Sequence, residues 1–354
     1  MPPEPRRRLA IVLFNLGGPD RPEAIRPFLL NLFRDPAILR VPFFVRPLLA
    51  WIIARARVAP ATANYALIGG KSPLLELTIG QAGALERALP ELDARCFVAM
   101  RYWHPFSLET ARAILEWKPD RILLLPLYPH YSTTTSGSSI RAWREAAAKA
   151  GLVAEVTTLC CWFDDPGYAA ATAAIVAGSY AEARVELDPA TPLRVLFSAH
   201  GLPEIIVKSG DPYQHQIERC VAAVLAAWGQ ADIDWAICYQ SRATPQKWIG
   251  PSTEDEIERA AHDRVAVLVV PIAFVSDHSE TLVELDIEYR EVAAKAGLPG
   301  YFRAPAQNSD PRFIAALADI VRGACARGPG LCSHAGGKLC PAAFKDCPHG
   351  RGAA

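Results

Sequence analysis

A row of three glutamates is the pattern in this sequence that points most directly to chemistry. Glu280, Glu284 and Glu288 recur every four residues, and on a helix this spacing places side chains on one face, with Cβ atoms about 5–6 Å apart. An acidic row is most often a solvated surface. Here, however, no Lys or Arg lies between Asp277 and Glu288, although like charges at this spacing destabilise a helix. We therefore interpret the row as a path that attracts a divalent cation or carries protons away.

A histidine at the end of an apolar run is the second chemical feature. His200 follows the run at 193–198, and His278 precedes the acidic row. A histidine at a strand end is structural more often than catalytic. A neutral imidazole, with an unperturbed pKa of about 6.5, is nevertheless suited to accept protons near neutral pH. His200 together with the carboxylate row predicts metal handling without a permanent metal cage.

Eight short apolar runs rich in Val, Ile and Leu must position these residues. Continuous apolar runs suit parallel strands that are covered on both faces. Segments typical of helices, such as 110–118 and 140–150, lie between them, and the resulting β-α-β rhythm predicts an α/β fold. The runs cover residues 9–14, 96–102, 121–128, 153–159, 193–198, 235–239, 265–272 and 300–302.

The two halves of the chain resemble each other. ILLLPLY at 122–128 matches VLVVPIA at 267–273, and a polar loop follows each. This likeness predicts two Rossmann-like, doubly wound lobes with parallel sheets, and a ligand in the cleft outside the carboxyl ends of the strands. We place the first lobe at 1–165, the second at 166–325 and a Cys-rich tail at 326–354.

Composition excludes some classes of protein. The 354 residues carry 37 basic and 37 acidic side chains, and nucleic-acid binding usually needs a clearly basic face. The apolar run that begins at Leu9 is too short for a signal peptide with a cleavage site. No run reaches the roughly 18 apolar residues of a spanning helix. We therefore expect a cytoplasmic protein that binds no nucleic acid.

The segment 25–60 combines apolar and aromatic side chains with arginines. It contains Phe43, Phe44 and Trp51, with arginines at 26, 34, 40, 46, 55 and 57. Such a mixture suits a segment that lies in the headgroup layer of a membrane. We predict a membrane-facing lip here; the alternative is a helical hairpin that buries its apolar side on its own domain.

Cysteines crowd near the C-terminus. Of nine cysteines, four lie at positions 325, 332, 340 and 347, in a stretch rich in Gly, Ala and Lys. In a cytoplasmic protein cysteines are expected to be reduced thiols or metal ligands. The clustering indicates a metal site. A zinc site that includes His334 or His349, and disordered thiols, are the alternatives.

Several stretches, kept in one order between residues 9 and 325, are similar to the ferrochelatase family. They include LFNLGGP at 13–19, RYWHP at 101–105, FSAHGLP at 197–203, WIGP at 248–251 and VPIAFVSDH at 270–278. The resemblance implies a chelatase-like fold with a porphyrin in the cleft between the lobes. It also implies that His200 takes up pyrrole protons or receives the metal, that Glu280 is its partner across the ring, and that Glu284 and Glu288 continue the acidic path.

The same resemblance identifies residues at the strand ends as the porphyrin site. To the implied set we add Tyr128 and Ser132, which follow the third predicted strand, and we count His278 with the metal path. The predicted substrate-binding residues are Asn15, Leu16, Arg101, Tyr102, Tyr128, Ser132, Gln240, Ser241 and Trp248.

The resemblance extends to the tail, because some ferrochelatases carry a Cys-rich C-terminal extension that helps hold a [2Fe–2S] cluster. Such a cluster generally needs four cysteine ligands. The implied ligands are Cys332, Cys340, Cys347 and either Cys161 or Cys160.

The resemblance therefore implies a lyase that inserts Fe²⁺ into protoporphyrin IX to give protohaem, the last step of haem biosynthesis. A chelatase for another tetrapyrrole or metal, and a non-enzymatic porphyrin or haem carrier, are the alternatives. The expected partners are protoporphyrin IX, ferrous iron and, through residues 25–60, the surface of the inner membrane. The sequence leaves open whether the protein is a homodimer.

Overall fold

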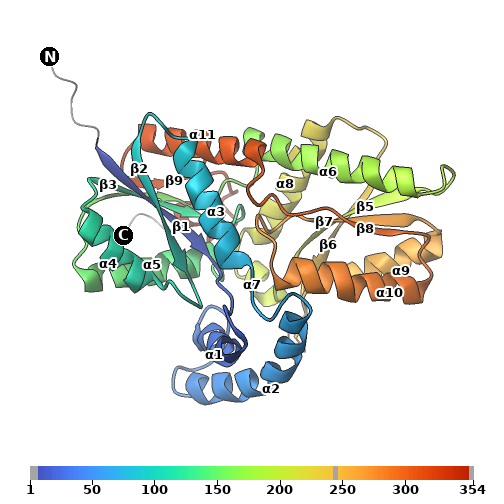
Figure 1. Cartoon of the computed structure of the whole chain (residues 1–354), viewed down its shortest axis with the longest axis horizontal. Helices are drawn as coiled ribbons and strands as arrows, with labels where there is room; N and C mark the ends of the chain where they lie inside the picture. Colours follow the sequence, from blue (N-terminus) through green and yellow to red (C-terminus); the bar gives the residue numbers. More distant parts are fainter. Residues whose placement is uncertain (1–6, 242–245, 351–354) are drawn as a thin grey trace. The chain divides into compact units, whose positions relative to one another are not determined.

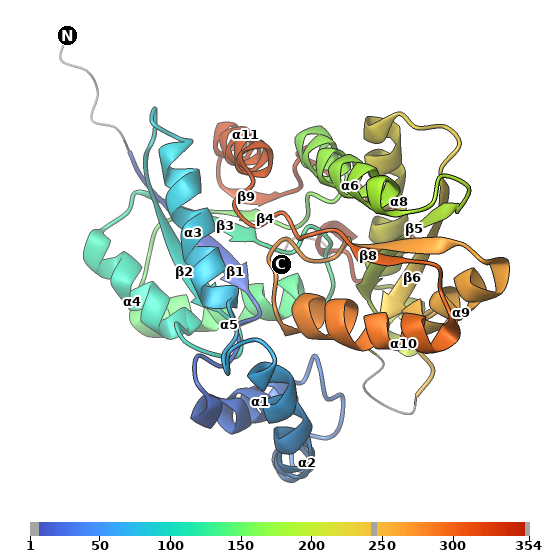
Figure 2. The same ribbon diagram turned by 45° about the vertical axis from the view of Figure 1, so that its right-hand side comes forward.

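The computed structural model describes residues 7–241 and 246–350 of the chain. The chain divides into two compact units, Met1–Trp162 with Leu317–Leu339 and Phe163–Ala316 with Cys340–Ala354. Figures 1 and 2 show the elements of both, coloured along the sequence. The last four residues of the predicted tail, 351–354, lie outside the described part.

A five-stranded parallel sheet organises the first unit. Every residue of β1 (Arg8–Asn15), an interior strand of this sheet, is buried after Arg8, as expected for a strand covered on both faces. Asn15 pairs with Met100 and Phe14 with Pro126, so three carboxyl ends reach the same edge of the sheet. The spatial order is β2-β1-β3-β4-β9, with β1 Arg8–Asn15, β2 Asp93–Met100, β3 Arg121–Pro126, β4 Glu155–Leu159 and β9 Gly330–Cys332.

Helices α3 (Leu74–Arg87), α4 (Ser107–Trp117) and α5 (Ser136–Ala150) follow the first strands of this sheet. Alternate residues of β1, including Phe14, share one apolar cluster with α4 and α5. There Trp143 meets Phe14 edge-on, with ring centroids 5.9 Å apart. Ile11 and Leu13 are also fully buried, and because strand residues alternate between faces, the opposite face of the sheet is covered too.

A pair of helices, α1 (Ile25–Arg34) and α2 (Arg46–Ala66), follows a 3₁₀ turn at Pro22–Ala24 and lies near the carboxyl end of β1 in Figure 1. One side of this pair is buried, since Ile25, Phe28 and Leu29 pack with Tyr102 in one cluster. In the segment between the two helices, Phe43 and Phe44 are 79% and 72% exposed. No helix in the described ranges has both the length and the apolar character that a membrane crossing requires.

The second unit repeats the topology of the first. Its parallel sheet has the order β6-β5-β7-β8. In both units, therefore, the first strand along the chain has the second strand on one side and the third, then the fourth, on the other. Pro126 ends β3 and Pro271 ends β7, as the matched runs predicted. The strands are β5 Leu193–His200, β6 Asp234–Gln240, β7 Ala266–Pro271 and β8 Tyr301–Arg303.

The segment after β7 is a π-helix, Glu280–Glu288, which continues into α10 (Tyr289–Ala296). Its wider turn was not predicted, because spacing alone does not separate four residues on an α-helix from four on a π-helix. The other helices of the second half are α6 Pro166–Glu186, α7 Glu204–Lys208, α8 Tyr213–Trp228, α9 Thr253–Asp263 and α11 Pro311–Arg327, and a 3₁₀ turn covers Pro348–Gly350.

All eight predicted strands are present, which confirms the α/β architecture with parallel sheets. The ninth, β9, was not predicted. It comes from the Cys-rich tail, where composition indicated little that could pack. Backbone pairing with β4 holds it, with Leu159 opposite Cys332, and such pairing needs no apolar pattern. The predicted boundaries near 165 and 325 remain predictions.

Candidate active site

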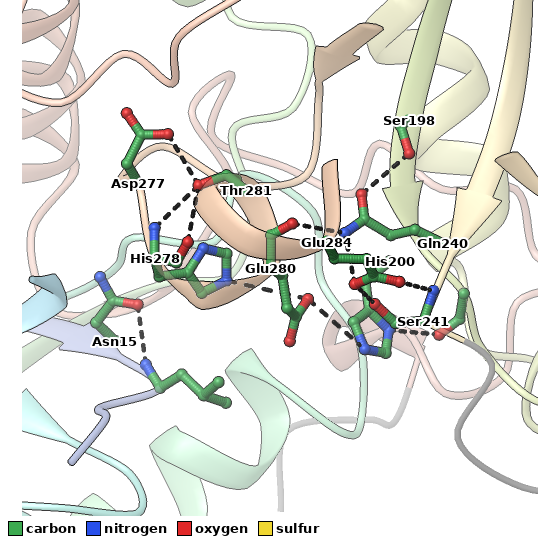
Figure 3. Close-up of polar contacts among 12 residues, drawn as sticks. Asn15, Ser198, His200, Gln240, Ser241, Asp277, His278, Glu280, Thr281 and Glu284 are labelled. Carbon is green, nitrogen blue, oxygen red and sulfur yellow. Dashed lines mark hydrogen bonds and ion pairs between the residues drawn. The ribbon is translucent and has the colours of Figure 1, made fainter. Parts of the chain in front are cut away.

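Two strand ends of the second unit bring the first site residues together. His200 ends β5 and is paired with Gln240, which ends β6. Gly201 packs closely behind this pair, because a Cβ there would stand 2.9 Å from the Gln240 carbonyl oxygen and 3.2 Å from the Trp248 ring. Figure 3 shows these side chains pointing towards the π-helix. Parallel strands thus place His200 and Gln240 at one edge, as expected from the sequence.

The tautomer of His200 follows from its hydrogen bond. Nδ1 lies 2.6 Å from the carbonyl oxygen of Gly201. A carbonyl only accepts, so Nδ1 must carry the hydrogen, and in the neutral ring the lone pair is on Nε2. That nitrogen is 3.8 Å from Oε2 of Glu280. His200 therefore presents a basic nitrogen to a carboxylate.

Glu280 lies between two histidines, as Figure 3 shows. Its Oε2 is 3.8 Å from Nε2 of His200 and 4.0 Å from Nε2 of His278. Within the described residues this oxygen is buried and accepts no hydrogen bond. Buried polar atoms are normally satisfied, so this oxygen is available to accept a proton or to bind a cation. Burial lowers the pKa of His278, although the charges of Glu280 and Asp277 act against this.

A polar network fixes the start of the π-helix. Asp277 accepts hydrogen bonds from Thr281 at 2.8 Å, Arg303 at 3.1 Å and Asn308 at 2.8 Å. The backbone N–H of His278 donates to the Thr281 hydroxyl. These bonds hold the His278 backbone and the first turn that carries Glu280.

Glu284, the second member of the acidic row, is clamped by four donors. Oε1 accepts from the Ser241 N–H at 2.8 Å and the Tyr289 hydroxyl at 3.0 Å. Oε2 accepts from Nε2 of Gln240 at 3.2 Å and from the Ser241 hydroxyl. Burial raises the pKa of Glu284 and the charge of Glu280 adds to this, while the hydrogen bonds from Ser241 and Tyr289 and the nearby His200 act in the opposite direction.

The acidic row is therefore not uniform. Glu280 is partly buried, Glu284 is clamped and Glu288 is exposed. The three carboxylates share a helix, as predicted, but each has a different environment. Within the described residues no group of three or more His, Cys, Asp or Glu side chains is arranged to hold a metal ion.

Aromatic rings enclose His200. The ring centroids of Trp248 and Phe274 are each 6.5 Å from that of His200, and Phe274 is 4.4 Å from His278. The sequence analysis singled out Trp248 but not Phe274. Its position three residues after the end of a buried strand, between Pro271 and His278, was the available signal.

The predicted porphyrin residues of the first unit gather at its strand ends. The backbone N–H groups of Arg101 and Tyr102 donate to the carbonyls of Asn15 and Leu16 at 2.9 and 3.0 Å. The Asn15 side chain donates to the Thr78 hydroxyl. It also accepts from the Leu16 N–H, the dashed line at Asn15 in Figure 3. Tyr102 is fully buried, whereas the Arg101 side chain is 22% exposed.

Tyr128 and Ser132 follow β3 in the same unit. Burial raises the pKa of the Tyr128 hydroxyl well above its ordinary value, so it stays protonated. Ser132 is fully buried and shares a hydrogen bond with Thr134 at 2.8 Å. Contact of any of these residues with a porphyrin remains a prediction.

Known proteins match almost the whole chain. The family model named Ferrochelatase covers residues 8–325. Ferrochelatases of Caulobacter vibrioides (strain NA1000 / CB15N) and Phenylobacterium zucineum (strain HLK1) are each 50% identical, and the matches cover 98% and 94% of this chain and 99% and 97% of theirs. The ferrochelatase of Synechocystis sp. is 43% identical over 89% of this chain and 82% of its own.

The chain belongs to the ferrochelatase family. It is therefore an enzyme, a lyase that inserts ferrous iron into protoporphyrin IX to give protohaem, and the predicted activity is confirmed.

Solved chelatases share the fold. The structure of SirB from Bacillus subtilis with Fe³⁺ superposes with a TM-score of 0.51 at 12% identity, over 91% of this chain and 96% of SirB. The sirohydrochlorin chelatase SirB from Bacillus subtilis subspecies spizizenii, in complex with cobalt, gives 0.50 at 12% identity, over 90% and 96%. These matches confirm the chelatase-like α/β fold of this ferrochelatase family member.

The cysteines implied as cluster ligands fall in both units. In the first, the Cys160 N–H donates to the Cys332 carbonyl at 2.8 Å and the sulfurs of Cys160 and Cys161 are 3.2 Å apart. In the second, Nε2 of Gln216 donates to the sulfur of Cys340 at 3.1 Å. The thiol donors fit an iron–sulfur cluster chemically, but neither unit, in its described part, assembles a four-ligand site by itself.

We expect Glu280→Gln to lower the pKa of Glu284 towards the ordinary glutamate value. Burial, the largest cause of the raised pKa, remains in the variant. The negative charge of Glu280, the second-largest cause, is removed. A raised pKa favours the neutral carboxyl in the folded protein, so Glu284 costs stability as the pH rises from the ordinary glutamate value through its folded pKa. The variant should lose less stability over this window.

Carboxyl-carbon NMR titration measures the pKa, and urea unfolding at several pH values measures the stability. Glu291→Gln, which changes an exposed carboxylate of α10, is the matched control. An unchanged Glu284 titration in the Glu280 variant would contradict the coupling.

Proposed function

We propose that iron insertion takes place at His200 and Glu280, with His200 as the proton acceptor. Insertion of Fe²⁺ into a porphyrin releases the two protons of the pyrrole N–H groups. The Nε2 lone pair of His200, directed at Glu280 from 3.8 Å, supports this assignment. Once Nε2 takes a proton, the imidazolium faces a carboxylate, which stabilises it.

The second step of the proposal concerns the exit of the proton. Oε2 of Glu280 can accept the proton from His200 because, in the described residues, no hydrogen bond occupies it. His278, whose pKa is lowered by burial, keeps a neutral ring beside the same oxygen and adds no positive charge. His200 thus returns to its basic form for the second pyrrole proton.

We propose that the rest of the acidic row serves the metal. Glu288 is exposed and Glu284 lies one turn closer to Glu280, an order that suits a cation moving along the helix face. Passage at Glu284 exchanges hydrogen bonds from Ser241 or Gln240 for metal–oxygen bonds. Oxygen ligands of this kind suit a hard divalent ion.

We propose that the porphyrin contacts Trp248, Gln240 and Ser241 of the second unit. Trp248 supports this, since its ring lies within 6.5 Å of the His200 ring and offers an apolar face to a macrocycle. Aromatic faces favour such flat, apolar partners. The first-unit residues at the ends of β1, β2 and β3 complete the predicted porphyrin site.

We propose that Phe43, Phe44 and Leu48 touch a membrane surface. They are 79%, 72% and 64% exposed, within one stretch between α1 and the first turn of α2. Burying them in lipid gains roughly 1.5–3 kcal/mol for each side chain. Arg40, at the start of the same stretch, suits contact with anionic headgroups. The cytoplasmic location remains a prediction.

We also propose a [2Fe–2S] cluster on Cys332, Cys340, Cys347 and Cys161 or Cys160. Burial of the three tail cysteines supports this, because a Gly-, Ala- and Lys-rich tail has no apolar reason to bury them. The tail is held in place by backbone pairing of β9 and by stacking of Phe344 on His215 at 5.0 Å.

His200→Ala should lower kcat for iron insertion by at least about 100-fold, the usual contribution of a general base. Protoporphyrin binding, followed by fluorescence, should change little. Added imidazole should restore part of the activity, with a pH dependence that follows the pKa of imidazole. His262→Ala, in an exposed histidine of α9, is the control, and full turnover in His200→Ala would reject the role.

Phe43→Glu with Phe44→Glu should weaken binding to anionic phospholipid vesicles by at least about tenfold, because two apolar side chains are lost from the contact. Co-sedimentation measures the binding. Val153→Glu places one glutamate, in place of the two in the double variant, at another exposed apolar residue of the first unit and should bind as the unchanged protein does. Equal vesicle binding by the double variant and the control would contradict the membrane contact.

Anaerobically purified protein should show visible absorption bands, and about two iron and two sulfide per chain. Cys340→Ser and Cys347→Ser should each remove the bands, while Cys96→Ser, in β2, should retain them. Zinc without visible absorption would instead support the zinc alternative.

A further inference from the structure

Asp35 is a buried carboxylate to which neither the sequence analysis nor the proposed reaction assigns a role. It follows directly after α1, and its side chain is fully buried. A buried charge is costly unless it is paired and hydrogen-bonded. Burial acts to raise the pKa of Asp35, but the charge of Arg101 and the hydrogen bonds that Asp35 accepts outweigh it and hold the pKa below the ordinary value. The carboxylate is therefore ionised at neutral pH.

Four donors from three separate segments converge on this carboxylate. Oδ2 accepts from Nη2 of Arg101 at 2.7 Å, from the Tyr102 hydroxyl at 2.8 Å and from the Ser138 hydroxyl. Oδ1 accepts from the Ala37 N–H at 2.8 Å. Asp35 thus joins the segment after α1, the end of β2 and the start of α5.

The guanidinium of Arg101 is held on three sides as a result. Asp35 binds Nη2, Ser138 accepts from Nε at 2.7 Å, and the Tyr102 ring centroid lies 4.9 Å from the central guanidinium carbon. None of these groups engages Nη1, and 22% of the side chain is exposed. A guanidinium fixed in this way presents its remaining N–H donors in one direction, which suits a carboxylate partner.

The same region of the chain is attached to the strand ends at two more points. Nδ2 of Asn31 in α1 donates to the Tyr102 carbonyl at 3.1 Å, and Arg40 donates to the Thr133 hydroxyl at 3.2 Å. Asp35 lies between these contacts in the sequence. It is the buried charged member of a set that connects α1 and the segment after it to the residues around Arg101.

We propose that Asp35 is a positioning residue for the porphyrin, which acts by holding Arg101 so that Nη1 can bind a carboxylate of the substrate. The inference rests on the proposed place of Arg101 in the porphyrin site. Loss of the Asp35 charge leaves the guanidinium free to rotate. The cost falls on porphyrin binding and not on the proton transfer at His200.

Asp35→Asn should raise the Kd and KM for protoporphyrin about tenfold, the usual effect of losing a charged hydrogen bond. The KM for iron should be unchanged. Ser138→Ala removes the hydroxyl that bridges Asp35 and Nε of Arg101, and should raise the same constants about threefold. Ser138→Ala carries the test if Asp35→Asn does not fold, as judged by circular dichroism and thermal unfolding.

Asp20→Asn and Ser136→Ala are the matched controls. Asp20 is an exposed aspartate that accepts a hydrogen bond from the Trp103 indole at 3.0 Å, and Ser136 is a buried serine in the first turn of α5. Both should bind protoporphyrin with the Kd of the unchanged protein. Folded Asp35→Asn and Ser138→Ala proteins with that same Kd would overturn the proposal.

A double-mutant cycle separates positioning from a general loss of structure. If Asp35 acts through Arg101, then Asp35→Asn in an Arg101→Gln background should add no further loss of porphyrin binding. Additive losses would overturn the proposal while leaving Arg101 in the porphyrin site. Unchanged binding in Arg101→Gln alone would instead show that the proposed placement of Arg101 has failed, and the inference with it.

Discussion

The carboxylate of Glu284 connects the π-helix to the strand ends of the second unit. Three of its four donors come from the end of β6, and the fourth is the hydroxyl of Tyr289, the first residue of α10. They fasten the π-helix to the strand ends, while the Asp277 network fastens the helix start. Glu280, one turn away, is thereby held opposite His200. These bonds offset only part of the cost of burying the carboxylate, since the pKa of Glu284 stays raised.

The two units share one strand order but carry different side chains at equivalent strand ends. In both units the first strand is the second in the order of the sheet, between two neighbours, and it ends where the carboxyl ends of these parallel strands meet. The first unit places Asn15 there, whose amide is engaged by Thr78 and by the following backbone N–H. The second places His200, which keeps one nitrogen available. The fold supplies equivalent positions, and the side chain at each decides whether the position binds or reacts.

Much of the architecture was predictable from the sequence, because buried parallel strands leave continuous apolar runs such as 9–14 and 265–272. The strand-end positions of His200 and Gln240 follow from the same runs. The clamp on Glu284 was not predictable, since three of its donors come from Gln240 and Ser241, 44 and 43 residues away in sequence. Nor was β9, whose pairing uses backbone groups that every residue carries. Asp35 gave no signal either, because its partners become neighbours only once α1 folds against the end of β2.

The exposed aromatic pair between α1 and α2 has a practical consequence. Phe43 and Phe44 meet each other edge-on with ring centroids 5.6 Å apart, and together with Leu48 they form an adhesive apolar surface. In plain buffer this surface has only water or another protein molecule to contact. Self-association in detergent-free solution can therefore arise from contacts between these apolar surfaces. A native subunit interface has to be measured with detergent or lipid covering them.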